Sequence, residues 1–161
     1  MSGSENMRNI KRQIDSFDEI IEIIKNTKTV RIGINGGEYP YVVPMSYGYD
    51  VENGKAVIYI HGAAEGKRFN MLSANPDVCA EFDEFHGFFK VPGSATAHYE
   101  SVIGFGRAIR LSGAEAQNGL DLIMEHCGFG GEEYSCPVSE SVAVYRIALE
   151  KISGKRNDGS F

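Results

Sequence analysis

The stretch Ile58-Tyr-Ile-His-Gly-Ala-Ala-Glu-Gly-Lys-Arg-Phe-Asn-Met-Leu72 is the most informative part of this chain. Residues 56–60 alternate as a strand with one buried face, and the strand ends at His61-Gly62. Gly66-Lys67-Arg68 then opens an apolar helix. A helix N-terminus offers free N–H groups and a positive dipole end, here beside two cations, so we predict an anion site suited to a phosphate. An ordinary strand-to-helix turn with solvated Lys and Arg fits the local pattern equally well.

Size and composition narrow the class of protein. The 161 residues suffice for one domain with a real core, and 42% hydrophobic with 24% charged residues is ordinary for a soluble globular protein. Sixteen Lys plus Arg against 22 Asp plus Glu give a net charge of −6, which argues against nucleic acid or an anionic membrane as partner. No apolar run reaches the roughly 18 residues of a membrane span, and residues 1–6 lack a signal core, so we expect a cytoplasmic protein.

The three cysteines predict neither a disulfide framework nor a metal centre. The chain has an odd number of cysteines, Cys79, Cys127 and Cys136, and it has no Cys-x-x-Cys motif. Cys79 lies in an apolar strand pattern and is expected to be a small core residue. The sequence therefore predicts no metal site.

The pattern along the chain predicts a mainly β protein with peripheral helices. We expect an N-terminal arm at 1–14, one domain at 15–156 and a C-terminal tail at 157–161. Ser16-Phe-Asp-Glu19 is a capping box that opens the first helix. Predicted strands cover residues 29–34, 41–49, 55–60, 78–83, 99–111 and 142–152, helices follow Ser16, Gly66 and Gly113, and residues 86–98 and 128–140 are expected to be irregular. Hairpin connections between six strands favour an antiparallel barrel, with a bulge or a bend expected at Gly104 and Gly106.

Pro44 lies in the middle of the predicted strand 41–49. Proline cannot donate a ladder hydrogen bond, so it is confined to edge strands, bulges or places where something else meets the backbone. Two interpretations stay open. The strand is an edge of the sheet, or it leaves backbone groups free for a planar ligand such as an isoalloxazine ring.

Six blocks of sequence together resemble a known family: Arg31-Ile-Gly, Pro40-Tyr-Val-Val-Pro-Met-Ser-Tyr-Gly-Tyr-Asp50, Tyr59-Ile-His-Gly-Ala-Ala-Glu-Gly-Lys67, Asn75-Pro-Asp-Val-Cys79, Tyr99-Glu-Ser-Val-Ile-Gly-Phe-Gly-Arg-Ala108 and Ile152-Ser-Gly-Lys155. In this order they resemble the pyridoxamine 5′-phosphate oxidase-like FMN-binding split barrels, and within them the nitroimidazole-resistance (Nim-type) branch. The resemblance covers roughly residues 8 to 156. It implies a six-stranded antiparallel split β-barrel that binds FMN at the interface of a homodimer.

The resemblance also implies a set of site residues. The cofactor-binding set comprises Val43, Pro44, Met45, Ser46 and Tyr47 along the flavin ring, His61, Gly62 and Ala63 beside the ribityl chain, Gly66, Lys67 and Arg68 at the phosphate, and Ser101 and Val102 on the long strand. His61 is the expected catalytic residue, because its imidazole can donate to a flavin or a nitro oxygen. Two adjacent basic residues for a pyridoxine phosphate substrate are not evident near the C-terminus, which puts vitamin B6 oxidation in doubt.

Three functions follow from this resemblance. The first is a flavin oxidoreductase that reduces a nitroaromatic or other small acceptor, with the chemistry carried by the flavin. The second is a non-catalytic flavin- or haem-binding protein, in which His61 or His98 would ligate the iron. The third, a small-ligand sensing module, has less support because the chain shows no partner-binding segment. His126, at the end of a predicted helix, is expected to lie on the surface.

Overall fold

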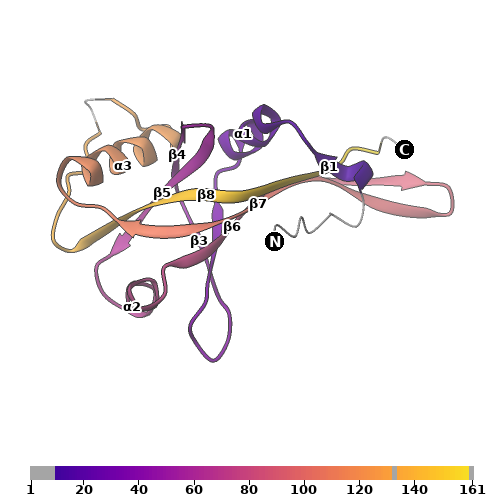
Figure 1. Cartoon of the computed structure of the whole chain (residues 1–161). Coiled ribbons are helices and arrows are strands. Elements are labelled where there is room, and N and C mark those ends of the chain that lie inside the picture. The colour runs from indigo at the N-terminus through magenta and orange to yellow at the C-terminus, as the bar shows by residue number, and fades with distance from the viewer. Residues whose placement is uncertain (1–9, 132–133, 160–161) are drawn as a thin grey trace.

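The computed structural model describes residues 10–131 and 134–159 and is dominated by one antiparallel sheet (Figure 1). Residues 1–9 of the expected arm and 160–161 of the expected tail lie outside the described residues. The elements are η1 (Ile10–Arg12), β1 (Gln13–Ile14), α1 (Phe17–Asn26), β2 (Val30–Ile34), β3 (Tyr41–Met45), β4 (Gly48–Glu52), β5 (Lys55–Ala63), α2 (Lys67–Ala74), β6 (Asp77–Val91), β7 (Ser94–Arg110), α3 (Gly113–His126) and β8 (Val142–Asn157).

The sheet has eight strands in the described part of the chain, where the sequence predicted six. The order is β3-β2-β6-β7-β8-β5-β4, and β1 pairs with β8 outside this path. Every pairing is antiparallel. The sheet curls without closing, so the predicted mainly β, antiparallel split barrel is confirmed and only the number of strands was wrong.

One added strand arises because the predicted strand 41–49 is really two. It breaks at Ser46-Tyr47, where the fully buried Tyr47 ring enters the core and its hydroxyl donates toward the carbonyl oxygens of Ile24 and Thr27, the latter at 2.8 Å. β3 and β4 then end the sheet at opposite edges. Pro44 therefore lies on an edge strand, which is the first of its two interpretations.

The segment expected to be irregular, residues 86–98, is instead the outer part of a long hairpin. β6 and β7 stay paired out to Val91 and Ser94, and they project from the body as a two-stranded arm (Figure 1). One register shift falls between Phe85 and Gly87. A second falls between β7 and β8 at Phe105/Gly106, which confirms the bulge predicted there.

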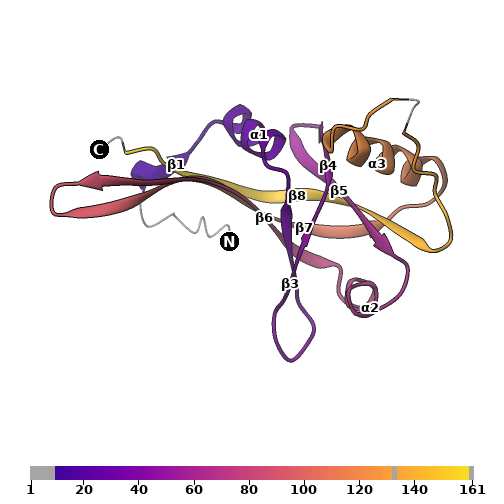
Figure 2. The same cartoon turned by 180° about the vertical axis from the view of Figure 1, so that it is seen from behind.

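Helices α1 and α2 lie on opposite sides of the strands (Figures 1 and 2). Of the predicted capping box the N-cap half is confirmed, since the Ser16 hydroxyl accepts a hydrogen bond from the Glu19 backbone N–H at 3.4 Å, whereas the Glu19 carboxylate accepts from Arg156. α1 buries its isoleucines and α2 buries Leu72 in the main core. α3 covers a second, smaller core that it shares with Val57 and Tyr59 of β5.

The prediction that His126 lies on the surface was wrong. Its ring nitrogens lie 2.8 Å from the Tyr47 carbonyl oxygen and 3.0 Å from that of Lys25, and its ring packs on Tyr47 at 4.4 Å between centroids. His126 thus joins the ends of α3 and α1 to the β3–β4 bend. Within the described part of the chain, no helix is long and apolar enough to cross a membrane.

The Tyr47 hydroxyl generates the first prediction. Tyr47→Phe removes the one buried hydroxyl proton that the carbonyl oxygens of Ile24 and Thr27 share, which should lower the free energy of unfolding by about 1–3 kcal/mol. Urea unfolding of the apo protein measures this. Tyr49→Phe, on the adjoining strand and only half buried, is the control. Equal effects of the two changes would contradict a special role for the Tyr47 hydroxyl.

Candidate functional site

The candidate site begins where β5 gives way to α2. Gly66 caps the helix with a φ of 89°, a conformation that favours glycine. The first turn of α2 contains no acidic residue and starts with Lys67 and Arg68. The positive end of the helix and two side-chain cations therefore coincide, which is the geometry the sequence predicted for an anion.

Arg68 lies directly against the backbone of Gly62. A Cβ placed on Gly62 would fall 1.5 Å from a terminal guanidinium nitrogen of Arg68, so only glycine leaves room for this contact. The guanidinium is therefore held over the end of β5. The predicted loop residues Gly62 and Arg68 are brought together by this packing.

His61 lies beside this contact but on the other face of β5. Side chains alternate along a strand, so the His61 imidazole lies on the same face as Tyr59, opposite the face where Arg68 covers Gly62. Its Nδ1 is buried and has no hydrogen-bond partner among the described residues. Burial, and then the charge of Arg68, lowers the pKa of His61, which favours the neutral imidazole.

Two further residues of the site were not predicted from the sequence. Tyr145 of β8 pairs in register with Ile60 and with Arg110, the last residue of β7. The Tyr145 hydroxyl is buried without a partner in the described chain. Burial raises the pKa of Tyr145, while the charges of Arg110 and Arg68 oppose that rise. Arg110 itself stacks over Phe69 of α2 at 5.2 Å.

Strand β3 reaches the site through Tyr41. The Lys67 Nζ lies 4.6 Å from the centre of the Tyr41 ring, which is a cation–π distance. Beyond Tyr41 the expected flavin-lining residues divide by face. Val43 and Met45 pack against the main core, whereas Pro44 and Ser46 are exposed.

The remaining predicted residues differ in which of their atoms a ligand could reach. The side chains of Tyr47 and Val102 are fully buried in the core, so any contact with a ligand would come from their backbone. Ser101 is half buried and pairs with Lys155 near the end of β8, whereas His61 pairs with Val144 near its start. Eleven residues of β8 separate the two pairings, roughly 36 Å if the strand were straight. Within one chain Ser101 and Arg68 therefore do not share a compact site.

The sheet face formed by β2, β6, β7 and β8 carries a hollow of about 850 Å³. Its lining includes Gly33, Cys79, Phe105 and Lys151. Exposed apolar side chains continue over the same strands and the adjoining edge, at Val42, Phe85, Ile103 and Phe105. Cys79 is half buried in this lining, and burial raises the pKa of its thiol.

An open antiparallel barrel with a cationic helix N-terminus over one strand end defines a split-barrel protein. The family model of pyridoxamine 5′-phosphate oxidase matches residues 16–156, so the chain belongs to this family. No curated protein is detectably similar in sequence.

Solved structures extend this result. A candidate 5-nitroimidazole antibiotic resistance protein from Bacteroides thetaiotaomicron is 30% identical, with a TM-score of 0.78 over 89% of this chain and 85% of that one. A flavocytochrome from Azotobacter vinelandii is 22% identical, with a TM-score of 0.78 over 96% and 73% of the two chains. An FAD- and haem-binding protein from Mycobacterium smegmatis is 14% identical, with a TM-score of 0.77 over 92% and 74%. The last two similarities show the fold alone.

The buried imidazole of His61 predicts a pH dependence of stability. Its pKa in the folded chain lies below the ordinary value of 6.5. As the pH falls through 6.5 the unfolded chain gains a proton before the folded chain does, so the free energy of unfolding decreases. We expect it to fall more steeply in wild type than in His61→Asn between about pH 7.5 and 5.5. Urea unfolding at both pH values measures this, and parallel decreases would contradict it.

Proposed function

We propose that the chain binds FMN with the phosphate at the start of α2. The observation that carries the proposal is the packing of Arg68, in the first turn of α2, against Gly62, which places a guanidinium over the end of β5 next to the helix N-terminus. A phosphate dianion matches both the dipole and the charge of such a site. Family membership supports a flavin as the molecule that bears this phosphate.

The surroundings of Arg68 fit a polar ligand. Lys67 in the same turn and Arg110 at the end of β7 add two cations. The Tyr145 hydroxyl, on the same face as Ile60 and Gly62, is a buried polar group whose hydrogen bond the described residues leave unmade, and the His61 Nδ1 is a second such group on the opposite face of β5. Such groups cost about 1–3 kcal/mol unless they are paired, so a ligand with its own donors and acceptors would stabilise them.

We further propose that the complete site lies between two copies of the chain. Ser101 and Val102, implied by the resemblance as cofactor residues, are at the far end of β8 from Arg68. A second chain packed on the sheet face of Phe105 and Ile103 would cover exposed apolar side chains. It would also bring its own Ser101 toward the first chain's phosphate group, so each site would use both ends of the sheet.

With FMN bound, the proposed activity is the reduction of a nitroaromatic such as a 5-nitroimidazole, with electrons from a nicotinamide. Bound FMN would supply the hydride and electron transfer. The chain would hold the phosphate through Lys67 and Arg68. His61 is the proposed catalytic donor, since its neutral imidazole carries one N–H that could stabilise charge growing on the nitro oxygens.

The phosphate site predicts a difference between FMN and riboflavin. Replacing Lys67 and Arg68 with Ala should weaken FMN by roughly 1.5–3 kcal/mol for each charge-assisted hydrogen bond removed, while riboflavin binding changes little. Gly62→Ala should act in the same direction, because its Cβ displaces the flexible end of Arg68. Fluorescence titration with both flavins measures these affinities.

The matched control is Lys25→Ala with Lys55→Ala, which removes two exposed cations that pair with Glu22 and Glu150 away from α2. This control removes the same two positive charges as the change at Lys67 and Arg68. It should leave FMN affinity unchanged apart from a weak long-range effect. If wild type binds riboflavin as tightly as FMN, the phosphate site is wrongly placed.

The proposed activity predicts that nitro compounds oxidise protein-bound reduced FMN faster than free reduced FMN. Chemically reduced holoprotein should be reoxidised by a 5-nitroimidazole faster than free reduced FMN. His61→Ala should slow this step by about 10²–10³, the usual effect of removing one donor to a developing oxyanion. Single-turnover stopped-flow measures both rates, with His61→Gln as the variant that keeps an N–H donor. Equal rates for wild type, His61→Ala and free FMN would disprove the nitroreductase function and leave flavin binding untouched.

The alternative function is non-catalytic binding of a flavin or haem. Two structures of similar fold are described as a flavocytochrome and as an FAD- and haem-binding protein. An absorbance spectrum of the purified protein separates these cofactors, because a haem gives a Soret band and a flavin does not.

A further inference from the structure

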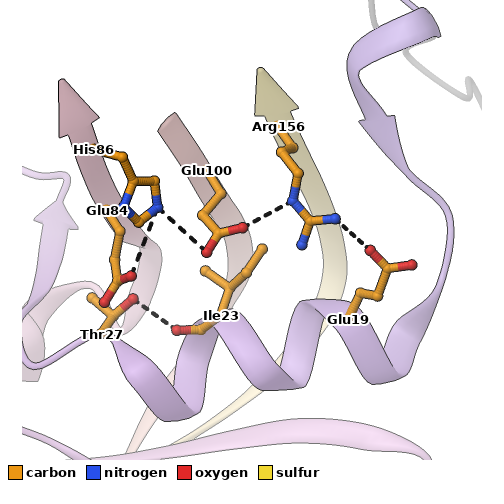
Figure 3. Close-up of polar contacts among 7 residues, drawn as sticks. All are labelled: Glu19, Ile23, Thr27, Glu84, His86, Glu100 and Arg156. Atoms are coloured by element: carbon orange, nitrogen blue, oxygen red, sulfur yellow. Dashed lines mark hydrogen bonds and ion pairs between the residues drawn. The ribbon is translucent and has the colours of Figure 1, made fainter. Parts of the chain in front are cut away.

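A second cluster of charged residues lies at the opposite end of the sheet, at the base of the β6–β7 arm (Figure 3). Glu84 of β6 pairs in register with Glu100 of β7, and Glu100 pairs in register with Arg156 of β8. The three side chains form a row across neighbouring strands on the face toward α1. Carboxylates placed directly opposite each other across two strands repel.

The bulge between Phe85 and Gly87 adds His86 to this row. The bulge leaves His86 out of the strand pairing and turns its ring toward both carboxylates (Figure 3). The His86 Nε2 lies 3.9 Å from the Glu84 Oε2 and 3.7 Å from the Glu100 Oε1. These separations are too long for hydrogen bonds. They are within the distance of an ion pair if the imidazole is protonated, and with a neutral imidazole the three groups converge on one point without a hydrogen bond between them.

We infer that Glu84, His86 and Glu100 bind a divalent transition-metal ion. Their ligand atoms all lie within 4.8 Å of one another. Two ligands about 2.1 Å from one metal can be at most about 4.2 Å apart, and both distances from the His86 Nε2 meet that limit. Two carboxylates and an imidazole suit Zn²⁺ and ions of similar size, and three protein ligands leave a position open for water.

The charges around the cluster favour a dication. Arg156 donates to the Glu100 Oε2 at 2.9 Å and to the Glu19 Oε2 of α1 at 2.6 Å. With Glu84, the cluster holds three carboxylates and one guanidinium, a formal charge of −2 that one divalent ion neutralises. Arg156 also fixes the Glu100 carboxylate so that its other oxygen faces His86 (Figure 3). Such hydrogen bonds to a metal ligand hold it in position for the ion.

This site is separate from the proposed flavin site. Glu100 pairs with residue 156 of β8, whereas Tyr145, beside Arg68, lies eleven residues earlier on that strand. Ser101, which the proposed flavin site would also use, follows Glu100 on β7, but neighbouring side chains on a strand point to opposite faces, so Ser101 lies on the face away from the cluster. Metal binding can therefore be tested whatever the outcome of the flavin experiments.

The test is calorimetric titration of chelator-treated full-length protein with Zn²⁺ alone. We expect one ion per chain, and a dissociation constant at least about tenfold larger in Glu84→Gln and in His86→Asn, since even changes next to a metal ligand cost 10–100-fold. Both variants keep the Arg156 ion pairs, so both should fold without metal, and Glu84→Gln, which removes the repulsion between Glu84 and Glu100, should have a metal-free Tm no lower than that of wild type. Added Zn²⁺ should raise the Tm of wild type and leave that of both variants nearly unchanged.

Two controls make the result decisive. Glu22→Gln removes an exposed carboxylate elsewhere on α1 and should bind Zn²⁺ as wild type does. Co²⁺ should give wild type visible absorption bands of a site with oxygen and nitrogen ligands, absent in both variants. The inference is overturned if wild type takes up no Zn²⁺. It is equally overturned if binding persists in both variants and is abolished in Cys127→Ser, which would place the ion on an exposed thiol.

Discussion

The pairing of β8 is the constraint on which the rest of the structure depends. β8 forms hydrogen bonds with β5 over residues 142–148, with β7 over 145–157 and with β1 at 154–155. Its first half therefore belongs to the barrel wall under α2 and α3, and its second half supports the long arm. Because the strand is extended, its two ends cannot contribute to one small site in the same chain.

The two ends of β8 carry opposite charge. Near residue 145 the cations Arg68 and Arg110 lie close to the buried Tyr145 hydroxyl, which lacks a partner among the described residues, and Lys67 adjoins Arg68 in the first turn of α2. Near residue 156 three carboxylates gather with one guanidinium. One end therefore suits an anion and the other a cation. An acidic chain can in this way hold a phosphate, because the charges near a site outweigh the net charge of −6.

The sequence could predict what depends on short-range pattern. The N-cap at Ser16, the glycine at the start of α2 and the bulge near Gly106 are local signals, and all three are confirmed. Gly87, Pro92 and Gly93 suggested a break in the chain, but continuous cross-strand pairing extended β6 and β7 through that segment. Residues brought in by strand register, such as Tyr145 beside Arg110, Glu84 beside Glu100, or His126 against Tyr47, give no local signal. They could not be found without knowing which strands pair.

The most direct test of the account is the molar mass of the protein and its FMN stoichiometry in the same sample. Under the proposal that both Arg68 and Ser101 contact the cofactor, their separation along β8 means that a second chain would complete each site. Light scattering with absorbance detection should give twice the 17.7 kDa of one chain, with two FMN molecules per dimer. Variants that break the dimer at the exposed Ile103 and Phe105 face should lose FMN together with the dimer. A monomer of 17.7 kDa that binds one FMN with full affinity would contradict the account.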